Sequence, residues 1–264
     1  MKPRLDLFQN QGQKIYFLLE GDSSSPLITL LNGFARTHAD FKIMTNKLVQ
    51  NGFRVLTLDN RGSGLSRAEK SFTIEDMVDD IRKLWDFLNI ERTFLLGISM
   101  GGMIARCLCL QDTRVKKVVF VSTCSMKKYI SEHRVKFSTD FDQVHDQMLR
   151  YFHPAFISRN DLLVRSMVKQ MVKQSADGSY LEQTNLQRLA LERFDLDEFS
   201  KSKIDIETLV VHGKQDQIIS IEGARELLDQ TDGAKAIEYE ECGHLILAEK
   251  PAQFYNDIIS FFNH

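Results

Sequence analysis

Three residue types that together perform acyl-transfer chemistry occur far apart in the chain, each just after a strand-like run. Ser99 lies in GISMGG (97–102), where an apolar run meets a helix-like segment; Asp216 follows TLVVHG (208–213), and His244 follows KAIEYEECG (235–243). A serine hydroxyl is a weak nucleophile that needs a base to take its proton, and the base needs an acid to orient it. The order Ser, Asp, His therefore predicts a nucleophilic site built from three loops.

The glycines around Ser99 strengthen this interpretation. A turn that ends a strand and starts a helix within one residue strains the serine backbone and crowds the residues two before and two after it. Gly97, Gly101 and Gly102 occupy the crowded region. Such a turn places the hydroxyl at a helix N-terminus, which stabilises negative charge. The pattern alone is also that of an ordinary serine cap with packing glycines.

The elements that must position these residues alternate between strand and helix. Short apolar, β-branched runs are typical of parallel strands buried on both faces, and they occur at 27–31, 54–59, 93–99, 117–123 and 207–213. Segments with helical spacing occur at 38–52, 73–90, 100–112, 220–230 and 251–262. The alternation predicts an α/β fold with a doubly wound, mostly parallel sheet. Residues 5–9 and 14–21 are expected to form an antiparallel hairpin at one edge.

The chain resembles an α/β-hydrolase of the small, capped, esterase and lactonase type. The resemblance covers most of the chain and includes DNRGSGLS (59–66), which is similar to that family's D-x-R-G-x-G-x-S turn. It implies a structural role for Asp59 and Arg61. It also implies an oxyanion hole made by the backbone N–H groups of Phe34 and Met100. Asn32 stands where the family usually has histidine, and it is expected to change the hydrogen bonding of that loop.

The alternation breaks at residues 125–203, which carry amphipathic stretches at 142–152 and 161–174. We therefore expect a hydrolase core at 1–124 and 204–264 and a helical cap at 125–203, forming a lid over Ser99. Apolar cap residues either pack the cap or line a ligand cavity; the candidates for substrate contact are Met148, Phe152, Met167 and Met171. Residues 125–175 hold nine Lys or Arg and five Asp or Glu, an excess expected of a solvated helical face.

Bulk composition limits the classes of partner. The chain has 264 residues and a formal net charge of −2, without a basic stripe or tail, so no nucleic-acid partner is expected. No signal-peptide h-region or membrane-spanning run is visible, which predicts a cytoplasmic protein. The expected substrate is a small molecule with an ester-like bond. The four cysteines are expected to be buried apolar residues, without metal or cofactor. The sequence does not indicate an oligomeric state.

Some residues that resemble catalytic groups are discounted. Cys242 lies two residues before His244 but has no strand-to-helix turn of its own. The other histidines are expected to be satisfied surface residues: His38, His133, His145, His153, His212 and His264.

The predicted function is a serine hydrolase that cleaves a small-to-medium carboxylic ester, lactone or thioester through an acyl-enzyme. Ser99 excludes haloalkane dehalogenases and epoxide hydrolases in their usual form, because those enzymes use aspartate at the nucleophile position. The same three residues also serve carrier-protein methyl ester esterases, carbon–carbon bond hydrolases, hydroxynitrile lyases and cofactor-free haloperoxidases. A ligand receptor without turnover is a further alternative. The apolar cap candidates favour an acyl group of modest size.

Overall fold

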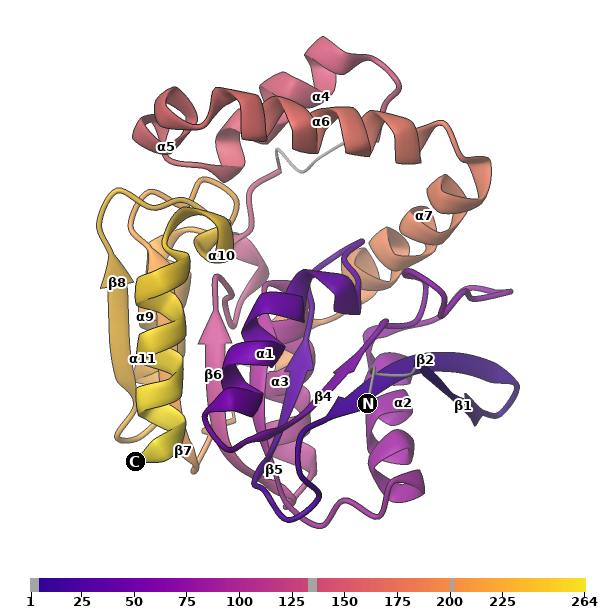
Figure 1. The fold of residues 1–264 in the computed structure, drawn as a ribbon, viewed down its shortest axis with the longest axis vertical. Helices are drawn as coiled ribbons and strands as arrows, with labels where there is room; N and C mark the ends of the chain where they lie inside the picture. The colour runs from indigo at the N-terminus through magenta and orange to yellow at the C-terminus, as the bar shows by residue number, and fades with distance from the viewer. Residues whose placement is uncertain (1–4, 133–136, 200–201) are drawn as a thin grey trace.

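The computed structural model describes residues 5–132, 137–199 and 202–264. One sheet of eight strands runs through the described residues in the order β1-β2-β4-β3-β5-β6-β7-β8 (Figure 1). The strands are β1 (Asp6–Asn10), β2 (Gln13–Glu20), β3 (Leu27–Leu31), β4 (Arg54–Leu58), β5 (Thr93–Ile98), β6 (Val115–Val121), β7 (Glu207–Gly213) and β8 (Lys235–Tyr239). β1 and β2 form the antiparallel hairpin at one edge, and β3 to β8 are parallel.

Seven of the eight expected strands are confirmed to within two residues at each end, whereas β8 ends at Tyr239, four residues before the end of the expected run 235–243. All five side chains of β3 are buried, as are six of the seven in β7. Strands buried on both faces have no polar side to mark their register, so their apolar runs are continuous. Because β3 to β8 are parallel, their carboxyl ends reach one edge of the sheet, and the loops that follow them meet there.

Helices cover both faces of the sheet. On one face lie α1 (Lys42–Gln50) and α11 (Pro251–Asn263), which pack on an apolar cluster centred on Leu96 and Val119. On the other lie α2 (Ile74–Phe87), α3 (Met100–Gln111) and α9 (Ile221–Asp229). This arrangement confirms the doubly wound sheet.

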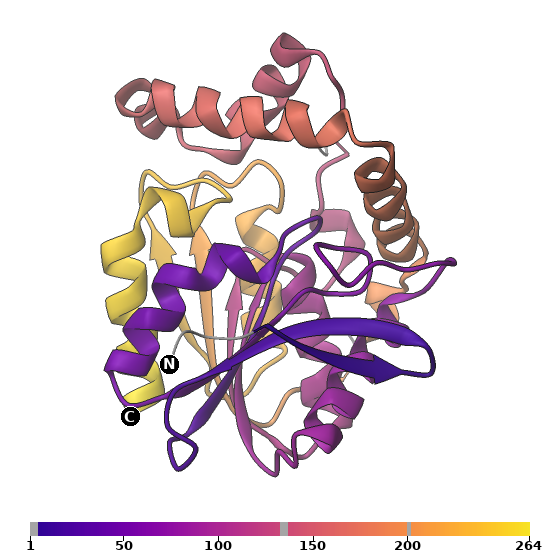
Figure 2. The ribbon, with the colours of Figure 1, turned by 45° about the vertical axis from the view of Figure 1, so that its right-hand side comes forward.

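A helical insertion connects β6 to β7. It contains α4 (Phe141–Met148), α5 (Pro154–Arg159), α6 (Asp161–Ser175), α7 (Gly178–Arg193) and α8 (Leu196–Phe199). Figures 1 and 2 show α4 to α6 crossing above the carboxyl edge of the sheet, while α7 runs down from α6 to the body. The division at residues 124/125 and 203/204 stays a prediction. Shorter helices are η1 (His38–Phe41), η2 (Lys127–Tyr129), η3 (Leu149–Tyr151) and α10 (Ile246–Glu249).

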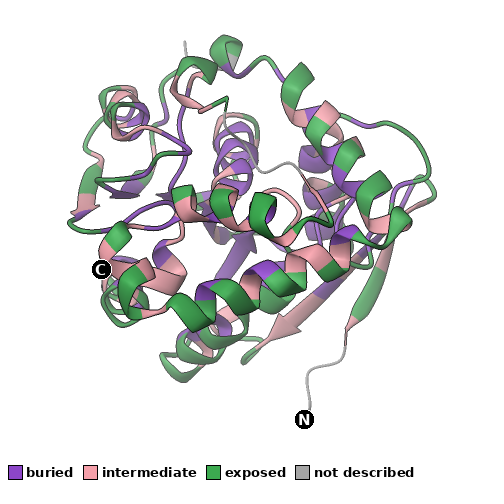
Figure 3. Ribbon diagram, turned by 90° about the horizontal axis from the view of Figure 1, so that it is seen from above, coloured by how far each residue is buried: buried purple, intermediate pink, exposed green. Residues whose placement is uncertain are grey.

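The insertion has two modes of packing. α4 and α6 form an apolar cluster of their own, with Val144, Val164 and Val168 buried. α7 instead buries polar side chains, Gln183 and Gln187 among them. In Figure 3, which views the molecule from above, the helices are exposed on their outer sides and the central strands beneath them are buried, while the edge strands β1 and β8 are partly exposed. No helix among the described residues is long and apolar enough to cross a membrane.

Candidate active site

Ser99 occupies the sharp turn between β5 and α3. Its φ is +54° and its ψ is −118°, a strained combination for a residue with a side chain. A Cβ on Gly97 would lie 2.4 Å from the carbonyl oxygen of Gly101, and one on Gly102 would lie 2.6 Å from the Thr123 side chain. The Thr123 hydroxyl donates to the Ser99 carbonyl at 2.8 Å. The glycines therefore permit a turn that leaves the serine side chain at the end of the strand.

His244 and Asp216 meet beside this turn. The Nδ1 atom of His244 lies 2.7 Å from Oδ2 of Asp216, and both residues are buried. The other carboxylate oxygen, Oδ1, accepts the backbone N–H groups of Ile218 at 2.8 Å and Ile219 at 3.0 Å. These two donors fix the carboxylate plane, and the carboxylate in turn fixes the imidazole.

A second histidine reaches the same carboxylate. His212 is only 1% exposed, and its Nε2 lies 3.3 Å from Oδ2 of Asp216 and 2.9 Å from the carbonyl oxygen of Ile219. The prediction that His212 lies on the surface is wrong, because the 216–219 loop covers the carboxyl end of β7, where His212 lies. Burial raises the pKa of Asp216, but the nearby imidazoles of His244 and His212 more than offset this and hold that pKa well below its ordinary value.

The segment that carries His244 is anchored to the cap and to the sheet. The carbonyl oxygen of Tyr151 accepts the backbone N–H groups of His244 at 2.9 Å and Leu245 at 3.2 Å. The Tyr151 ring stands edge-on to the imidazole, with ring centroids 5.5 Å apart. From the sheet side, the Ser122 hydroxyl donates to the His244 carbonyl at 3.0 Å. The sequence carries no signal for Tyr151, because its place depends on how the cap folds over the core.

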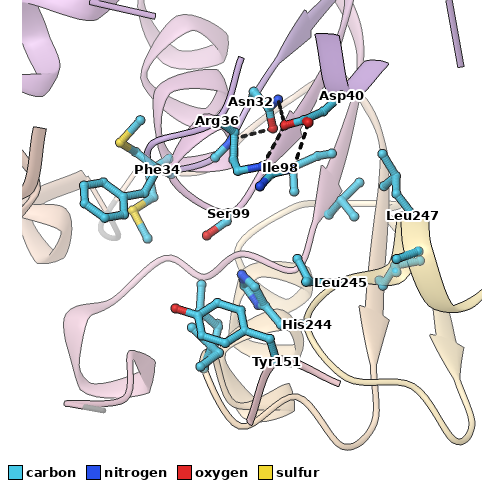
Figure 4. Close-up of a pocket in the computed structure, with 18 of the residues that line it drawn as sticks. Asn32, Phe34, Arg36, Asp40, Ile98, Ser99, Tyr151, His244, Leu245 and Leu247 are labelled. Carbon is cyan, nitrogen blue, oxygen red and sulfur yellow. Dashed lines mark hydrogen bonds and ion pairs between the residues drawn. The ribbon is translucent and has the colours of Figure 1, made fainter. Parts of the chain in front are cut away.

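Ser99 and His244 face each other across a cavity of about 340 Å³ (Figure 4). Its lining is mostly apolar and comes from both core and cap. The described lining residues include Ile98, Met103, Ile130, Tyr151, Met167, Leu191, Ile218, Leu245 and Leu247. The cap therefore forms part of the cavity wall, and its role as a lid over Ser99 stays a prediction.

The two residues expected to form an oxyanion hole border the same cavity. Phe34 and Met100 both line it. Met100 begins α3, and the first N–H groups of a helix have no acceptor within the helix. A Cβ built on Gly33 would lie 3.4 Å from the Cβ of Ser99, so the loop after β3 packs directly against the serine. Donation by these N–H groups to a substrate oxygen stays a prediction.

Asn32 makes three hydrogen bonds within this loop, and a difference from histidine at this position stays a prediction. Its Oδ1 accepts the backbone N–H of Gly33 at 2.8 Å, and its Nδ2 donates to the Thr37 carbonyl at 2.7 Å and to Asp40 at 3.1 Å. Asp40 also accepts two hydrogen bonds from Arg36, both of 2.7 Å. The side chain thus closes the loop on itself and joins it to an ion pair at the cavity wall.

Asp59 and Arg61 hold the turn that follows β4. The buried Asp59 accepts from the backbone N–H groups of His38 and Leu65, each at 2.9 Å. Arg61 makes two hydrogen bonds to Asp80, at 2.7 and 2.8 Å. Neither residue belongs to the described cavity lining, in keeping with the structural role expected for both.

The four cap candidates differ in position. Met167 lines the cavity, whereas Met148 and Phe152 are buried in the apolar cluster of the cap and Met171 packs against that cluster. The last three are not among the described residues of the lining. Met148 and Met171 lie on helices and Phe152 on the connection between η3 and α5, and all three face the interior of the cap, a distinction that apolar spacing alone cannot make. Contact between Met167 and a substrate stays a prediction.

The remaining cysteine and histidine expectations have separate outcomes. Cys242 is fully buried, and burial raises its pKa, which keeps the thiol protonated. Cys107 and Cys124 are also buried and Cys109 is partly so, and none of the four forms a disulfide among the described residues. His38, His145 and His153 are partly exposed and His264 is exposed, while His133 lies outside the described residues.

Known proteins place this architecture in a family. Residues 26–251 match the family model of the alpha/beta hydrolase fold. The 3-oxoadipate enol-lactonase 1 of Acinetobacter baylyi is 26% identical over 250 residues, covering 92% of this chain and 91% of that protein. The 2-hydroxy-6-oxo-6-(2'-aminophenyl)hexa-2,4-dienoic acid hydrolase of Metapseudomonas resinovorans is 25% identical over 270 residues, covering 98% and 91%.

A solved structure shows the same fold. The α/β-hydrolase enzyme MGS-M2 from a Medee basin deep-sea metagenome library superposes with a TM-score of 0.88 at 19% identity, covering 98% of each chain. The chain belongs to the α/β-hydrolase family, and it is a hydrolase of that superfamily.

Proposed function

We propose that the protein is a serine hydrolase that cleaves a carboxylic ester or lactone through an acyl-enzyme on Ser99. The observation that carries the proposal is the 2.7 Å contact between His244 and the buried Asp216, beside a serine held at a φ of +54°. Ser99 and His244 face each other in the cavity. A nucleophile, a base and an orienting acid in this arrangement serve acyl transfer.

In the proposed reaction, His244 accepts the Ser99 proton as Oγ attacks the substrate carbonyl carbon. Asp216 keeps the Nδ1 proton of His244 in place and stabilises the imidazolium that forms. The backbone N–H groups of Phe34 and Met100 stabilise the oxyanion. His244 then protonates the leaving alcohol oxygen, the carbon–oxygen bond breaks, and water repeats the sequence to release the acid and regenerate Ser99.

The cavity supports an uncharged, largely apolar substrate. Arg36 is the one cationic side chain in the described lining, and it is paired with Asp40 at 2.7 Å. A substrate with a free carboxylate would have to compete with Asp40 for that cation. The apolar wall that includes Met103, Met167 and Leu191 suits an acyl chain of modest length. These features favour a neutral ester or lactone over an acid-bearing substrate of a carbon–carbon bond hydrolase.

The experiment that tests the proposal compares wild type with Ser99→Ala after treatment with a fluorophosphonate, by intact mass. We expect one adduct on wild type and none on the variant, and steady acid release from p-nitrophenyl esters by wild type alone. The two proteins should unfold at similar temperatures, since Ser99 is only partly buried. Near wild-type turnover by Ser99→Ala would refute the assignment. A labelled wild type without ester turnover would favour a ligand receptor.

A further inference from the structure

Helix α7 joins the cap to the core through two glutamines one turn apart. Gln187 is completely buried and Gln183 is 7% exposed. Each side chain uses both ends of its amide on backbone groups of the core. Gln183 accepts the N–H of Ala68 at 2.7 Å and donates to the carbonyl of the same residue at 2.9 Å. A buried amide that lost such partners would pay the cost of desolvation without compensation.

Gln187 binds the loop that carries one expected oxyanion donor. Its Oε1 accepts the N–H of Ala35 at 2.9 Å, and its Nε2 donates to the Arg61 carbonyl at 2.8 Å. Ala35 directly follows Phe34 and has a φ of +57°, a left-handed conformation that is unfavourable for alanine. The Ala35 N–H belongs to the peptide group that joins Phe34 to Ala35. Its hydrogen bond to Gln187 therefore fixes the orientation of that peptide group and, through it, the backbone conformation of Phe34.

Two further contacts fit this role. Gly62 has a φ of +79°, and a Cβ there would lie 2.9 Å from Cγ of Gln187, so the glycine leaves the space that the amide needs. The Phe34 ring packs against Phe137 at 5.9 Å between centroids, and Phe137 packs against Tyr180 of α7 at 5.5 Å. Helix α7 thus contacts the loop both by a buried hydrogen bond and through tilted and edge-on contacts between aromatic rings.

We propose that Gln187 is a positioning residue of the cap that sets the direction of the Phe34 N–H in the oxyanion hole. The inference rests on the proposed acyl-transfer function. Gln187 is not in the described cavity lining, so it acts through Ala35 and not on the substrate. The cap would then contribute to stabilisation of the transition state as well as to substrate binding.

The test compares Gln187→Leu with the matched control Gln183→Leu. Each variant removes two side-chain hydrogen bonds between α7 and the core, but only Gln187→Leu removes the one that holds the loop carrying Phe34. Loss of one oxyanion donor typically lowers kcat by about 100- to 1000-fold. Since Gln187→Leu misdirects the donor without removing it, we expect kcat to fall about 10- to 100-fold with KM within about threefold. Gln183→Leu should keep kcat within about threefold, although both variants lose thermal stability.

A second readout separates positioning from general damage. A trifluoromethyl ketone forms an oxyanion with the nucleophile, so its inhibition constant should rise by the same factor as kcat/KM falls. Gln187→Glu is the variant to use if leucine prevents folding. A protonated glutamic acid can accept from Ala35 and donate to the Arg61 carbonyl, whereas the ionised form cannot donate. The kcat of Gln187→Glu relative to wild type should therefore rise as the pH is lowered from 9 to 6.

The outcomes are distinct. An unchanged kcat in Gln187→Leu, or an equal loss in Gln183→Leu, would overturn the role of Gln187 while Ser99-dependent turnover by wild type upheld the proposed function. Wild type without Ser99-dependent turnover would overturn both.

Discussion

Replacing Asp216 by asparagine tests the proposed site most directly, because the structure dictates how the new amide would be oriented. Oδ1 of Asp216 receives two backbone N–H groups, from Ile218 and Ile219. In the variant, the amide oxygen has to occupy that position, since an NH₂ group there would face two donors. The NH₂ group then points at Nδ1 of His244, which lies 2.7 Å from Oδ2 in wild type. A donor there forces His244 to carry its proton on Nε2.

This tautomer cannot accept the Ser99 proton, so the loss should be large although the side-chain shape is kept. In serine proteases the equivalent change lowers kcat by about 10⁴-fold, and at 1.36 kcal/mol per factor of ten this corresponds to about 5.4 kcal/mol of activation free energy. We expect a loss of the same order for Asp216→Asn on a p-nitrophenyl ester. A second mutation, Ser99→Ala, should then add little, because the two residues act as a unit.

A matched control is available at the far end of α3 from Ser99. Asp112→Asn also replaces a hydrogen-bonded carboxylate, one that accepts from Arg114 at 2.7 Å, but it should leave kcat within about twofold. Circular dichroism and thermal unfolding would show that both variants are folded. Asp216→Asn retaining more than about a tenth of wild-type kcat would refute the reasoning about the tautomer.

Two further predictions concern stability. Gly97→Ala should destabilise the protein by about 3 kcal/mol or more in urea unfolding, because its Cβ would lie 2.4 Å from a backbone oxygen that cannot move aside; Gly178→Ala, with nothing within 4 Å of the new Cβ, should be nearly neutral, and equal effects would argue against the crowded turn. The pKa of Asp216 is lower in the folded protein than its ordinary value, so the ionised carboxylate should stabilise the folded state at pH values above about 3.9, the unfolded-state pKa. This stabilisation should be lost as the pH falls from there toward the folded-state pKa. Urea midpoints measured from pH 6 to pH 3 should therefore fall less steeply in Asp216→Asn than in wild type, and parallel profiles would contradict this linkage.

The core of the fold was predictable because its physical signals are local. An apolar run such as 207–213 is buried on both faces, and its residues coincide with β7. Ser99, Asp216 and His244 each follow a strand-like run, and the carboxyl ends of parallel strands meet at one edge of the sheet, so the three residues could be expected to lie close together. Strand ends differed from the expected ones by up to two residues, and by four in β8, since hydrogen bonding to a neighbouring strand and not side-chain type decides where pairing stops.

The cap was predictable as helical but not in its packing. Helix α7 buries Gln183, Thr184 and Gln187, so its inward face is polar and apolar periodicity does not reveal it. The same limit applies to His212, whose burial depends on the loop that folds over it. Its spacing of four residues before Asp216 was the available signal, because a turn between them can bring both side chains together.

The two cap anchors restrict how a substrate can reach the cavity. Tyr151 holds the His244 segment through its carbonyl, while Gln187 and Gln183 bind backbone groups of Ala35, Arg61 and Ala68 in the core. Lifting the whole cap as one rigid lid would break all of these bonds together and expose buried amides. Ile43 of α1 and Leu247 of α10, which lie outside the cap, complete the described wall of the cavity. A cap that stays in place would leave substrate size limited by the volume of a cavity whose wall the core and the cap form together.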